Sequence, residues 1–510
     1  MKEAFGRVAV LKAAVFATAS AYITYALGLL LSVLIARHLG PSAYGQYAYV
    51  VWLAGMLIML GNHGLTGTGI KFISESMGRG DRDLASQVHG WLGRWQKLSL
   101  LLTVLAACIF VPLAKPAGWD GHMGALLGLV IVSFGFKAWS LFNTAMAKGY
   151  GAFNIEGITN VVSTMFSAVL VLLLYLSGAP LMGYLLAFAC TSIMYWACSV
   201  WLLRKHAIKA SDKMPEPTVL DKLKPHLWWT ILLALISAAG ARTVEILLTN
   251  RWLGDADMGY LAVAMGLSRG GIELLVAGLA TVIMPLMGYA FGSGDPTQVR
   301  RIFENATRYY QFVGLLLAGG GCFWSEALVT LMYGERYTPA IPVLRIFLLT
   351  AGVLMINGAA SAILTNSDNQ RFRVGVSVLS FLISAIMAVV LIPHYGLIGA
   401  ALASTISGVL SYAVIVVGIK LYTGLSIPWL ELARQYLAAG LAIVPATLIY
   451  LFTEGVVQRW VPGIIYGVAF VLISLSVKVW HADELAYVAS MAQRRPRYLG
   501  WVQHVLRLAR

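Results

Sequence analysis

Apolar segments long enough to cross a lipid bilayer recur along the whole of this sequence. A transmembrane helix needs about 20 consecutive, mostly apolar residues. Such segments lie at residues 11–36, 46–70, 97–114, 122–147, 155–176, 180–203, 226–249, 258–284, 308–332, 340–364, 374–393, 397–420, 431–452 and 461–480. Backbone groups in lipid must be paired within the segment, so each one is expected to be an α-helix. The sequence therefore predicts an all-α integral membrane protein with about fourteen transmembrane helices.

Composition favours a membrane transporter over an enzyme. The chain is 59% hydrophobic and 12% charged, whereas soluble domains are about 45–50% apolar and about 25% charged. The sequence contains no H-E-x-x-H, G-x-S-x-G or P-loop motif of soluble enzymes. Its four cysteines lie in or beside apolar segments without C-x-x-C spacing, which argues against a disulfide or zinc site. We expect no metal and no cofactor, and coupling to H⁺ or Na⁺ stays open.

Basic residues predict the orientation of the chain. There are 37 Lys and Arg against 22 Asp and Glu, and short cytoplasmic loops collect Lys and Arg. With the N-terminus inside, 28 of these 37 residues fall on cytoplasmic segments, five on extracytoplasmic loops and four within spans. Both termini are then cytoplasmic, because the number of spans is even. The orientation of the chain in the membrane thus explains its excess of Lys and Arg over Asp and Glu. No nucleic-acid partner is expected.

Three segments outside the membrane helices have features of their own. The N-terminus lacks a small-residue cleavage pattern, so the first span is expected to be retained. Residues 204–225 are rich in Lys and Pro and indicate a cytoplasmic linker. The tail, residues 481–510, alternates apolar residues with arginines. It is either a basic amphipathic segment on an anionic membrane surface or a disordered tail.

The chain contains an internal duplication. The stretch RHLGPSAYGQYA, from Arg37, is nearly matched by RWLGDADMGYLA, from Arg251, 214 positions later. The same spacing pairs further residues without a gap, among them Leu39 with Leu253, Gly40 with Gly254, Gly45 with Gly259, Ala48 with Ala262 and Arg94 with Arg308. Each stretch is expected to form the outer turn between the first two helices of its half, where the glycine permits a tight reversal.

The duplication predicts two lobes. Six spans in each half form an even number, so the repeats are parallel, as in one recognised class of transporters. The expected domains are an N-terminal lobe (1–203), the linker (204–225), a C-terminal lobe (226–420), two additional helices (421–480) and the basic tail (481–510). Two facing lobes create a central cavity whose opening can alternate by rocking, which indicates transport.

A few charged residues within the spans are candidates for a binding site. Arg242 and Glu245 lie three apart, and Arg269 and Glu273 lie four apart, so each pair can share one helical face. Lys137 lies deep in the fourth span. The arginines could bind a phosphorylated headgroup, because a guanidinium matches phosphate oxygens with two parallel hydrogen bonds. The alternative is that both pairs are salt bridges that only fix helix packing.

Other charges near the spans are expected to have simpler roles. Arg345 lies in the outer part of the tenth span and is expected to extend to the membrane interface. Glu156 begins the fifth span and is expected to be a solvated helix end or a packing contact. No Asp or Glu occurs between Ala4 and Ser74, so the first two spans contain no carboxylate. A cation-coupled drug exporter of this plan would be expected to have one there.

With its parallel six-helix lobes, the LGPSAYGQYA turn and the stretch HYGLIGAALAS from His394, the chain resembles bacterial polysaccharide flippases of the Wzx type. These belong to the multidrug, oligosaccharidyl-lipid and polysaccharide exporter superfamily. The resemblance covers nearly the full chain and implies a MATE-like fold. It also implies a protein of the bacterial inner membrane that moves an undecaprenyl-diphosphate-linked oligosaccharide to the periplasmic leaflet. The product enters O-antigen, capsule or exopolysaccharide, with a polymerase and chain-length proteins as possible partners.

Three alternatives remain beside this interpretation. A drug or small-solute antiporter of the same superfamily is disfavoured by the missing carboxylate in the first two spans. Lipid II flippases use arginines in their first spans, whereas here the first arginine of that region is Arg37 at the outer boundary. A membrane glycosyltransferase or polymerase would be expected to have acidic residues in a large extracytoplasmic loop, and the longest loop here is the linker.

Overall fold

The computed structural model describes residues 7–62, 64–114, 116–240, 242–273, 295–366, 370–453 and 458–481, with a few residues outside these ranges. All regular secondary structure in this part of the chain is helical. Ten helices among the described residues are long and apolar enough to cross a membrane. The chain is thus an all-α, multi-pass membrane protein, as the sequence predicted, while the total of fourteen spans stays a prediction.

The two longest helices each contain a glycine at which the chain turns. α1 (Arg7–Asn62) is non-helical at Gly40, with φ 74° and ψ 174°. α14 (Gln370–Thr423) is non-helical at Gly396, with φ 55° and ψ −133°. Glycine adopts such positive φ values readily because it has no Cβ. Each of these elements therefore joins two helices, and the reversal expected at Gly40 is confirmed.

The other helices follow one another with short connections. Those of the first half are α2 (Leu65–Gly78), α3 (Arg82–Ala114), α4 (Met123–Gly149), α5 (Asn154–Leu176) and α6 (Leu181–Lys205). Next come α7 (Pro217–Gly240), α8 (Thr243–Leu248), the π-helix η1 (Thr249–Leu253), α9 (Asp255–Ser268) and the π-helix η2 (Arg269–Glu273). The remainder are α11 (Pro296–Tyr333), η3 (Glu335–Tyr337), α12 (Ala340–Val353), η4 (Leu354–Ile356), α13 (Asn357–Asn366), α15 (Trp429–Phe452), η5 (Gln458–Trp460) and α16 (Val461–Ser476).

The chain divides into two compact units. The first comprises Met1–Gly266 and Val374–Ser407, and the second comprises Leu267–Arg373 and Gly408–Arg510. The first unit therefore holds the six helices of the first half, the segment from α7 to most of α9, and the middle of α14. The predicted lobe boundaries at the linker and after residue 420 stay a prediction.

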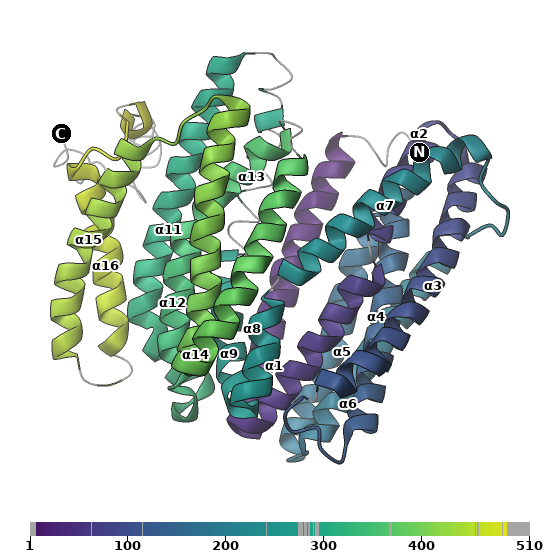
Figure 1. The fold of residues 1–510 in the computed structure, drawn as a ribbon, viewed down its shortest axis with the longest axis horizontal. Helices are drawn as coiled ribbons and strands as arrows, with labels where there is room; N and C mark the ends of the chain where they lie inside the picture. Colours follow the sequence, from purple (N-terminus) through teal and green to yellow (C-terminus); the bar gives the residue numbers. More distant parts are fainter. Residues whose placement is uncertain are drawn as a thin grey trace. The chain divides into compact units, whose positions relative to one another are not determined.

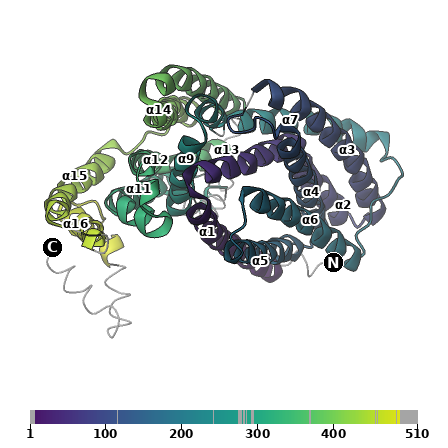
Figure 2. The same ribbon diagram turned by 90° about the horizontal axis from the view of Figure 1, so that it is seen from below.

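The first unit has a core that joins the helices on both sides of the linker. α4 packs against α6, and α1 packs against α5 (Figure 2). One apolar cluster buries Phe72, Trp91, Phe142 and Met146 together with Leu223 of α7. Burial of apolar side chains away from water stabilises such contacts. Helix α7, the first after the linker, is thereby anchored to the first half.

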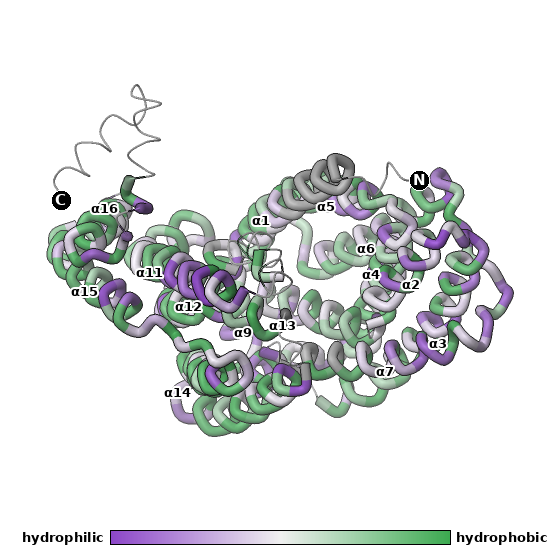
Figure 3. Tube along the Cα trace, turned by 90° about the horizontal axis from the view of Figure 1, so that it is seen from above, coloured by the Kyte–Doolittle hydropathy of each residue, from purple (hydrophilic) through white to green (hydrophobic). Residues whose placement is uncertain are grey.

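Helix α11 is central to the second unit. α12, α15 and α16 pack against it (Figure 1). Ala438, Ala442 and Ala446 of α15 share a buried cluster with Tyr466 and Phe470 of α16. Small residues let membrane helices approach closely. In Figure 3 hydrophobic residues colour most of α16 and much of α15, whereas hydrophilic residues are in view at the end of α11 and α12.

Candidate functional site

The two copies of the repeated stretch lie against each other in the first unit. A Cβ atom added at Gly45 would lie 1.7 Å from the backbone oxygen of Asp255, and one added at Gly259 would lie 2.2 Å from that of Pro41. At each of these two glycines, the backbone of the other copy occupies the space that a side chain would need. We call the contact formed by Gly45, Gln46, Asp255 and Gly259 the rim.

Polar side chains hold the rim together. The Nε2 of Gln46 donates a hydrogen bond of 2.7 Å to Oδ2 of Asp255. Asn250 Nδ2 donates to the other carboxylate oxygen at 3.3 Å, and the N–H of Ala117 donates to Asn250 Oδ1 at 3.1 Å. Burial raises the pKa of Asp255 above its ordinary value, and the hydrogen bonds from Gln46 and Asn250 oppose only part of this shift. The chain reverses beside the rim at Gly254, where φ is 99°.

A second contact joins helices α2 and α7, which belong to the two halves of the sequence. The hydroxyl oxygens of Thr68 in α2 and Thr230 in α7 lie 3.1 Å apart. One turn further along α2, the rings of Phe72 and His226 lie 5.5 Å apart, edge to face. In this structure the first half therefore contacts the start of the second half in two places, through the rim and through the α2–α7 contact.

Glu245 is a buried carboxylate bound by two serine hydroxyls. It lies on α8 with 3% of its surface exposed. Ser404 Oγ donates to Glu245 Oε1 at 3.0 Å, and Ser384 Oγ donates to the same oxygen. The two serines lie on either side of the turn in α14. Because ionisable groups within membrane helices are costly, they usually mark a functional site, and Glu245 is a candidate for one.

Arg242 lies at a break between two helices. α7 ends at Gly240 and α8 begins at Thr243, so the continuous span expected over 226–249 is interrupted. Arg242 has φ 57°, in the left-handed region that few residues other than glycine adopt. Arg242 and Glu245 therefore do not share one face of a continuous helix as expected. Broken membrane helices are typical of substrate sites in transporters, because the unpaired backbone groups can bind a ligand.

The second predicted pair belongs to the other unit. Arg269 is exposed and begins the π-helix η2, which contacts α11 and α12. The side chain of Glu273 lies outside the described part of the structure. Single π-helical turns within helices often occur at functional sites. The convergence of Arg242 and Arg269 on one site stays a prediction, because the two residues lie in different units.

Lys137 contacts an aromatic ring that the sequence did not indicate. Its Nζ lies 2.6 Å from the ring centroid of Tyr195 on α6. The Tyr195 hydroxyl lies 3.2 Å from that of Thr164 on α5. A lysine over the face of a tyrosine is stabilised by the ring quadrupole. Glu156 pairs with Lys148 at 2.6 Å and is partly exposed at the start of α5.

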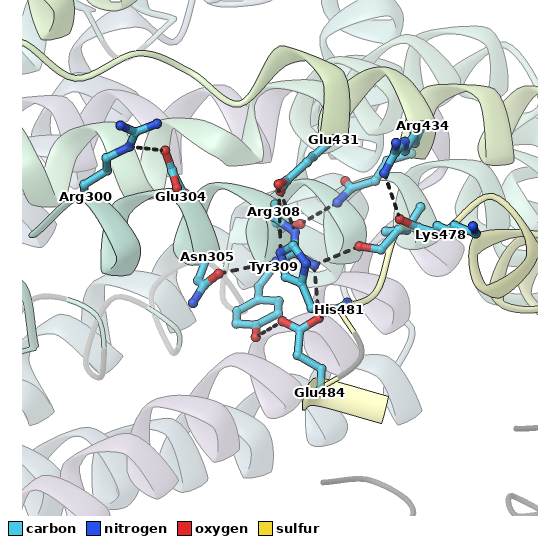
Figure 4. A network of polar contacts seen from close by, with 12 residues as sticks. Arg300, Glu304, Asn305, Arg308, Tyr309, Glu431, Arg434, Lys478, His481 and Glu484 are labelled. Carbon is cyan, nitrogen blue, oxygen red and sulfur yellow. Dashed lines mark hydrogen bonds and ion pairs between the residues drawn. The ribbon is translucent and has the colours of Figure 1, made fainter. Parts of the chain in front are cut away.

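Arg308 forms a further charge network, in the second unit. It is 2% exposed and lies 2.8 Å from Glu431 of α15 and 3.0 Å from Glu484 (Figure 4). Its guanidinium also donates to the carbonyl oxygen of Val479 at 2.8 Å, and Tyr309 Oη donates to Glu484 at 2.5 Å. The network therefore ties the segment that follows α16 to α11.

Replacing Arg308 with leucine is expected to lower the stability of the folded protein by about 3 kcal/mol. Removing one partner of a buried ion pair costs about 3–5 kcal/mol, and the lower end applies because Glu431 and Glu484 are 29% and 19% exposed. The thermal unfolding midpoint of the purified protein in detergent measures the loss. Arg300→Leu, which removes a surface pair with Glu304, is the control and is expected to change nothing measurable. Equal thermal unfolding midpoints for Arg308→Leu and Arg300→Leu would contradict the structural role of Arg308.

The same network predicts a dependence on pH. Burial alone would raise the pKa of Glu484, but hydrogen bonds from Tyr309 and the His481 N–H, with the charge of Arg308, lower it below its ordinary value of 4.5. A lowered folded-state pKa contributes stability that is present above the unfolded-state value and is lost as the pH falls through the folded-state value. The thermal unfolding midpoint is therefore expected to decrease as the pH is lowered below about 4.5. In Glu484→Gln this decrease should be smaller.

A family model described as "Polysaccharide biosynthesis protein" matches residues 10–291, more than half of the chain. The chain belongs to this family. The resemblance stated from the sequence is thereby confirmed at the level of the family. A second model, MatE, matches residues 231–390 of the chain.

Individual relatives agree with this assignment. "Capsular polysaccharide biosynthesis protein CapF" of Staphylococcus aureus is 26% identical over 304 residues, 56% of this chain and 72% of CapF. "Lipid III flippase" of Escherichia coli is 22% identical over 406 residues, 76% of this chain and 93% of the relative.

Solved structures show the fold. The inward closed conformation of the lipid II flippase MurJ matches with a TM-score of 0.71 at 16% identity, over 90% of this chain and 98% of MurJ. An inward-facing MATE family transporter of the MOP superfamily matches with a TM-score of 0.63 at 15% identity, over 79% and 94%. The chain thus has the fold shared by MurJ and MATE proteins.

Proposed function

We propose that the protein is a flippase that moves a lipid-linked oligosaccharide across the bacterial inner membrane. The observation that carries the proposal is the family match over residues 10–291. The similarity to a lipid III flippase over 76% of the chain supports it. The oligosaccharide is joined through a diphosphate to undecaprenol and moves from the cytoplasmic to the periplasmic leaflet. It then enters O-antigen, capsule or exopolysaccharide synthesis, where a polymerase and chain-length proteins are partners.

The proposed orientation places both termini in the cytoplasm. It is supported by the excess of Lys and Arg on the segments assigned to that side. The rim is then periplasmic, and the α2–α7 contact is cytoplasmic. Transport by alternating access requires each contact to open while the other stays closed. The lobes, 1–203 and 226–420, move relative to each other, and helices 421–480 accompany the second lobe.

The proposed substrate site is cationic. Arg242, Arg269 and Lys137 bind the diphosphate, while Glu245 and Glu273 balance their charge when the cavity is empty. The helix break at Arg242 supports this role, since broken helices are typical of substrate sites in membrane transporters. Salt bridges that only fix packing remain the alternative for Glu273 and Arg269. For Glu245 the two serine contacts support an additional role, in ion coupling.

Glu245 is the proposed coupling residue. A buried carboxylate bound by two hydroxyls can exchange a proton, or bind Na⁺ together with the serine oxygens, as the α14 segments move. Glu245→Gln keeps the size and an acceptor oxygen but cannot carry a negative charge. We expect the variant to lower the transport rate by about tenfold, which corresponds to about 1.4 kcal/mol, and to abolish its dependence on the ion gradient.

The control for this prediction is Glu156→Gln, because Glu156 pairs with Lys148 at a helix end. Its transport rate and ion dependence are expected to match those of the wild type. A Glu245→Gln protein that still responds to the same ion gradient would rule out the coupling role. The rates are measured in proteoliposomes with imposed H⁺ or Na⁺ gradients.

A drug or small-solute antiporter is the second candidate function. The MatE match over 231–390 and the fold of a MATE transporter favour it. The absence of Asp and Glu between Ala4 and Ser74 opposes it, because a cation-coupled exporter of this plan would be expected to carry an acid there. A lipid II flippase is a third candidate on the fold of MurJ. Lipid II would have to be bound without an arginine inside the first two spans.

Deletion of the gene distinguishes these candidates. For a flippase, we expect surface polysaccharide to disappear and a prenyl-diphosphate-linked oligosaccharide to accumulate in the inner membrane. Lipid extraction and mass spectrometry identify the accumulated glycan. Accumulation of lipid II would assign the protein to peptidoglycan synthesis. Unchanged polysaccharide with a new sensitivity to organic cations would assign it to drug export.

A further inference from the structure

Arg345 points into the protein. From its position near the end of its span it was expected to extend to the membrane interface. Instead its Nε donates a hydrogen bond of 2.9 Å to Oγ of Ser325 on α11, and its Nη2 donates to Oη of Tyr450 on α15 at 3.3 Å. Ser325 is fully buried. The half-buried guanidinium is thus held between α11, α12 and α15, all within the second unit.

The charges around Arg345 are not balanced. Among the described residues, Glu326 is the carboxylate of this cluster. It pairs with Arg459 of η5 and accepts a hydrogen bond of 2.8 Å from Tyr450. The contacts of Arg345 are with two neutral hydroxyls. In the part of the chain that the structure describes, the cluster therefore contains two guanidinium groups and one carboxylate. Because a charge removed from water is costly unless it is paired, the excess positive charge favours an anionic ligand.

Aromatic residues mark the depth of the cluster in the membrane. Trp324 donates a hydrogen bond from Nε1 to the carbonyl oxygen of Trp460 at 2.8 Å, and Tyr450 lies two residues before the end of α15. Tryptophan and tyrosine are enriched where lipid headgroups meet the hydrocarbon core. The cluster is thus at the level of headgroups. In the proposed orientation this is the periplasmic leaflet.

We propose that Arg345 binds the phosphate of an anionic lipid in that leaflet. Two of its five N–H groups contact Ser325 and Tyr450, and these contacts fix the plane of the guanidinium. The others can donate to phosphate oxygens, which a guanidinium recognises with two parallel bonds. The phosphate comes from a membrane phospholipid or from the prenyl diphosphate after translocation. Binding of the prenyl diphosphate rests on the proposed function, whereas binding of a membrane phospholipid does not.

The site is tested by native mass spectrometry of the purified full-length protein. Phosphatidylglycerol and farnesyl diphosphate are titrated separately as probes. Arg345→Gln is expected to raise the Kd of at least one probe by about tenfold, as the loss of one charge-assisted hydrogen bond predicts. Weakened binding of phosphatidylglycerol alone identifies the phospholipid as the source. Weakened binding of farnesyl diphosphate identifies the exported lipid.

Arg336→Gln is the matched control, because it removes the same charge from the exposed turn η3 nearby. Its Kd values are expected to equal those of the wild type. Glu326→Gln removes the negative charge of the cluster and is expected to tighten binding, so the test remains decisive if Arg345→Gln does not fold. Unchanged Kd values in both Arg345→Gln and Glu326→Gln, or equal losses in Arg345→Gln and Arg336→Gln, would overturn the proposal.

Discussion

Linking the two copies of the repeated stretch at the rim is expected to stop polysaccharide export completely. The variant combines Gln46→Cys with Asp255→Cys, since these side chains are hydrogen-bonded at 2.7 Å. The background replaces the four native cysteines with alanine. A short, membrane-impermeant bis-thiol reagent is added to intact cells and removed by a reductant. Export should cease on cross-linking and return on reduction, because alternating access with the proposed orientation requires the rim to open in every transport cycle.

The control links two positions within the first half. His38 Nε2 lies 3.1 Å from the carbonyl oxygen of Ala179, so His38→Cys with Ala179→Cys forms a bridge that does not join the two copies of the repeat. Export is expected to continue in that variant. A cross-linked rim that still exports polymer would show that the rim is a fixed contact. Failure of the reagent to react in intact cells, although it reacts in inverted vesicles, would place the rim in the cytoplasm and reverse the orientation.

Replacing Arg242 or Arg269 with alanine is expected to lower surface polysaccharide at least about 100-fold. Each arginine would supply two charge-assisted bonds to the diphosphate, and each bond contributes about 1.5–3 kcal/mol. The protein level in the membrane should stay normal, because alanine avoids the free-energy cost of holding a charged side chain within the membrane. Immunoblots of surface polysaccharide and of the membrane fraction measure the two quantities.

Arg336→Ala is the control for this pair, because it removes an exposed arginine outside the predicted spans. Its polymer output is expected to be normal. Arg242→Lys tests the geometry, since lysine keeps the charge but lacks the planar fork. Normal output from both alanine variants would exclude the cationic site at these residues and leave the salt-bridge interpretation.

Features set by local sequence could be predicted. The helical, membrane-spanning character follows from the apolar segments, and the reversals at Gly40 and Gly254 follow from the repeated stretch. The 214-residue spacing also pairs Gly45 with Gly259, which meet at the rim. In each case the residue type determines the local backbone conformation or how closely two backbones can approach. Such features can therefore be predicted from the sequence alone.

Contacts between distant helices could not be predicted. Nothing in the spacing of residues links Glu245 to Ser384 and Ser404, or Lys137 to Tyr195, because these pairs depend on how whole helices pack. The break at Arg242 was also missed, since the residues around it have the composition of an ordinary span. Periodicity reports which residues share a face of one helix and not which helix that face contacts.

Equivalent residues of the repeat have also acquired different surroundings. Arg94 is exposed and donates to the carbonyl oxygen of Asp212 in the linker at 3.1 Å. Its counterpart Arg308 is buried beside Glu431 and Glu484. The added helices α15 and α16 pack on α11 and cover Arg308, and the sequence predicts no such addition to the first half. A repeat therefore predicts equivalent positions in the fold but not equivalent environments.

The most direct test of the central claim is translocation by the purified protein in liposomes. A labelled prenyl-diphosphate oligosaccharide is placed in both leaflets, and a glycosidase added outside removes the accessible glycan over time. With a functional flippase, the inner pool is expected to become accessible faster than in protein-free liposomes, and this acceleration should be lost in Arg242→Ala. A rate no faster than in protein-free liposomes, from protein that retains its fold, would contradict the assignment as a lipid-linked oligosaccharide flippase.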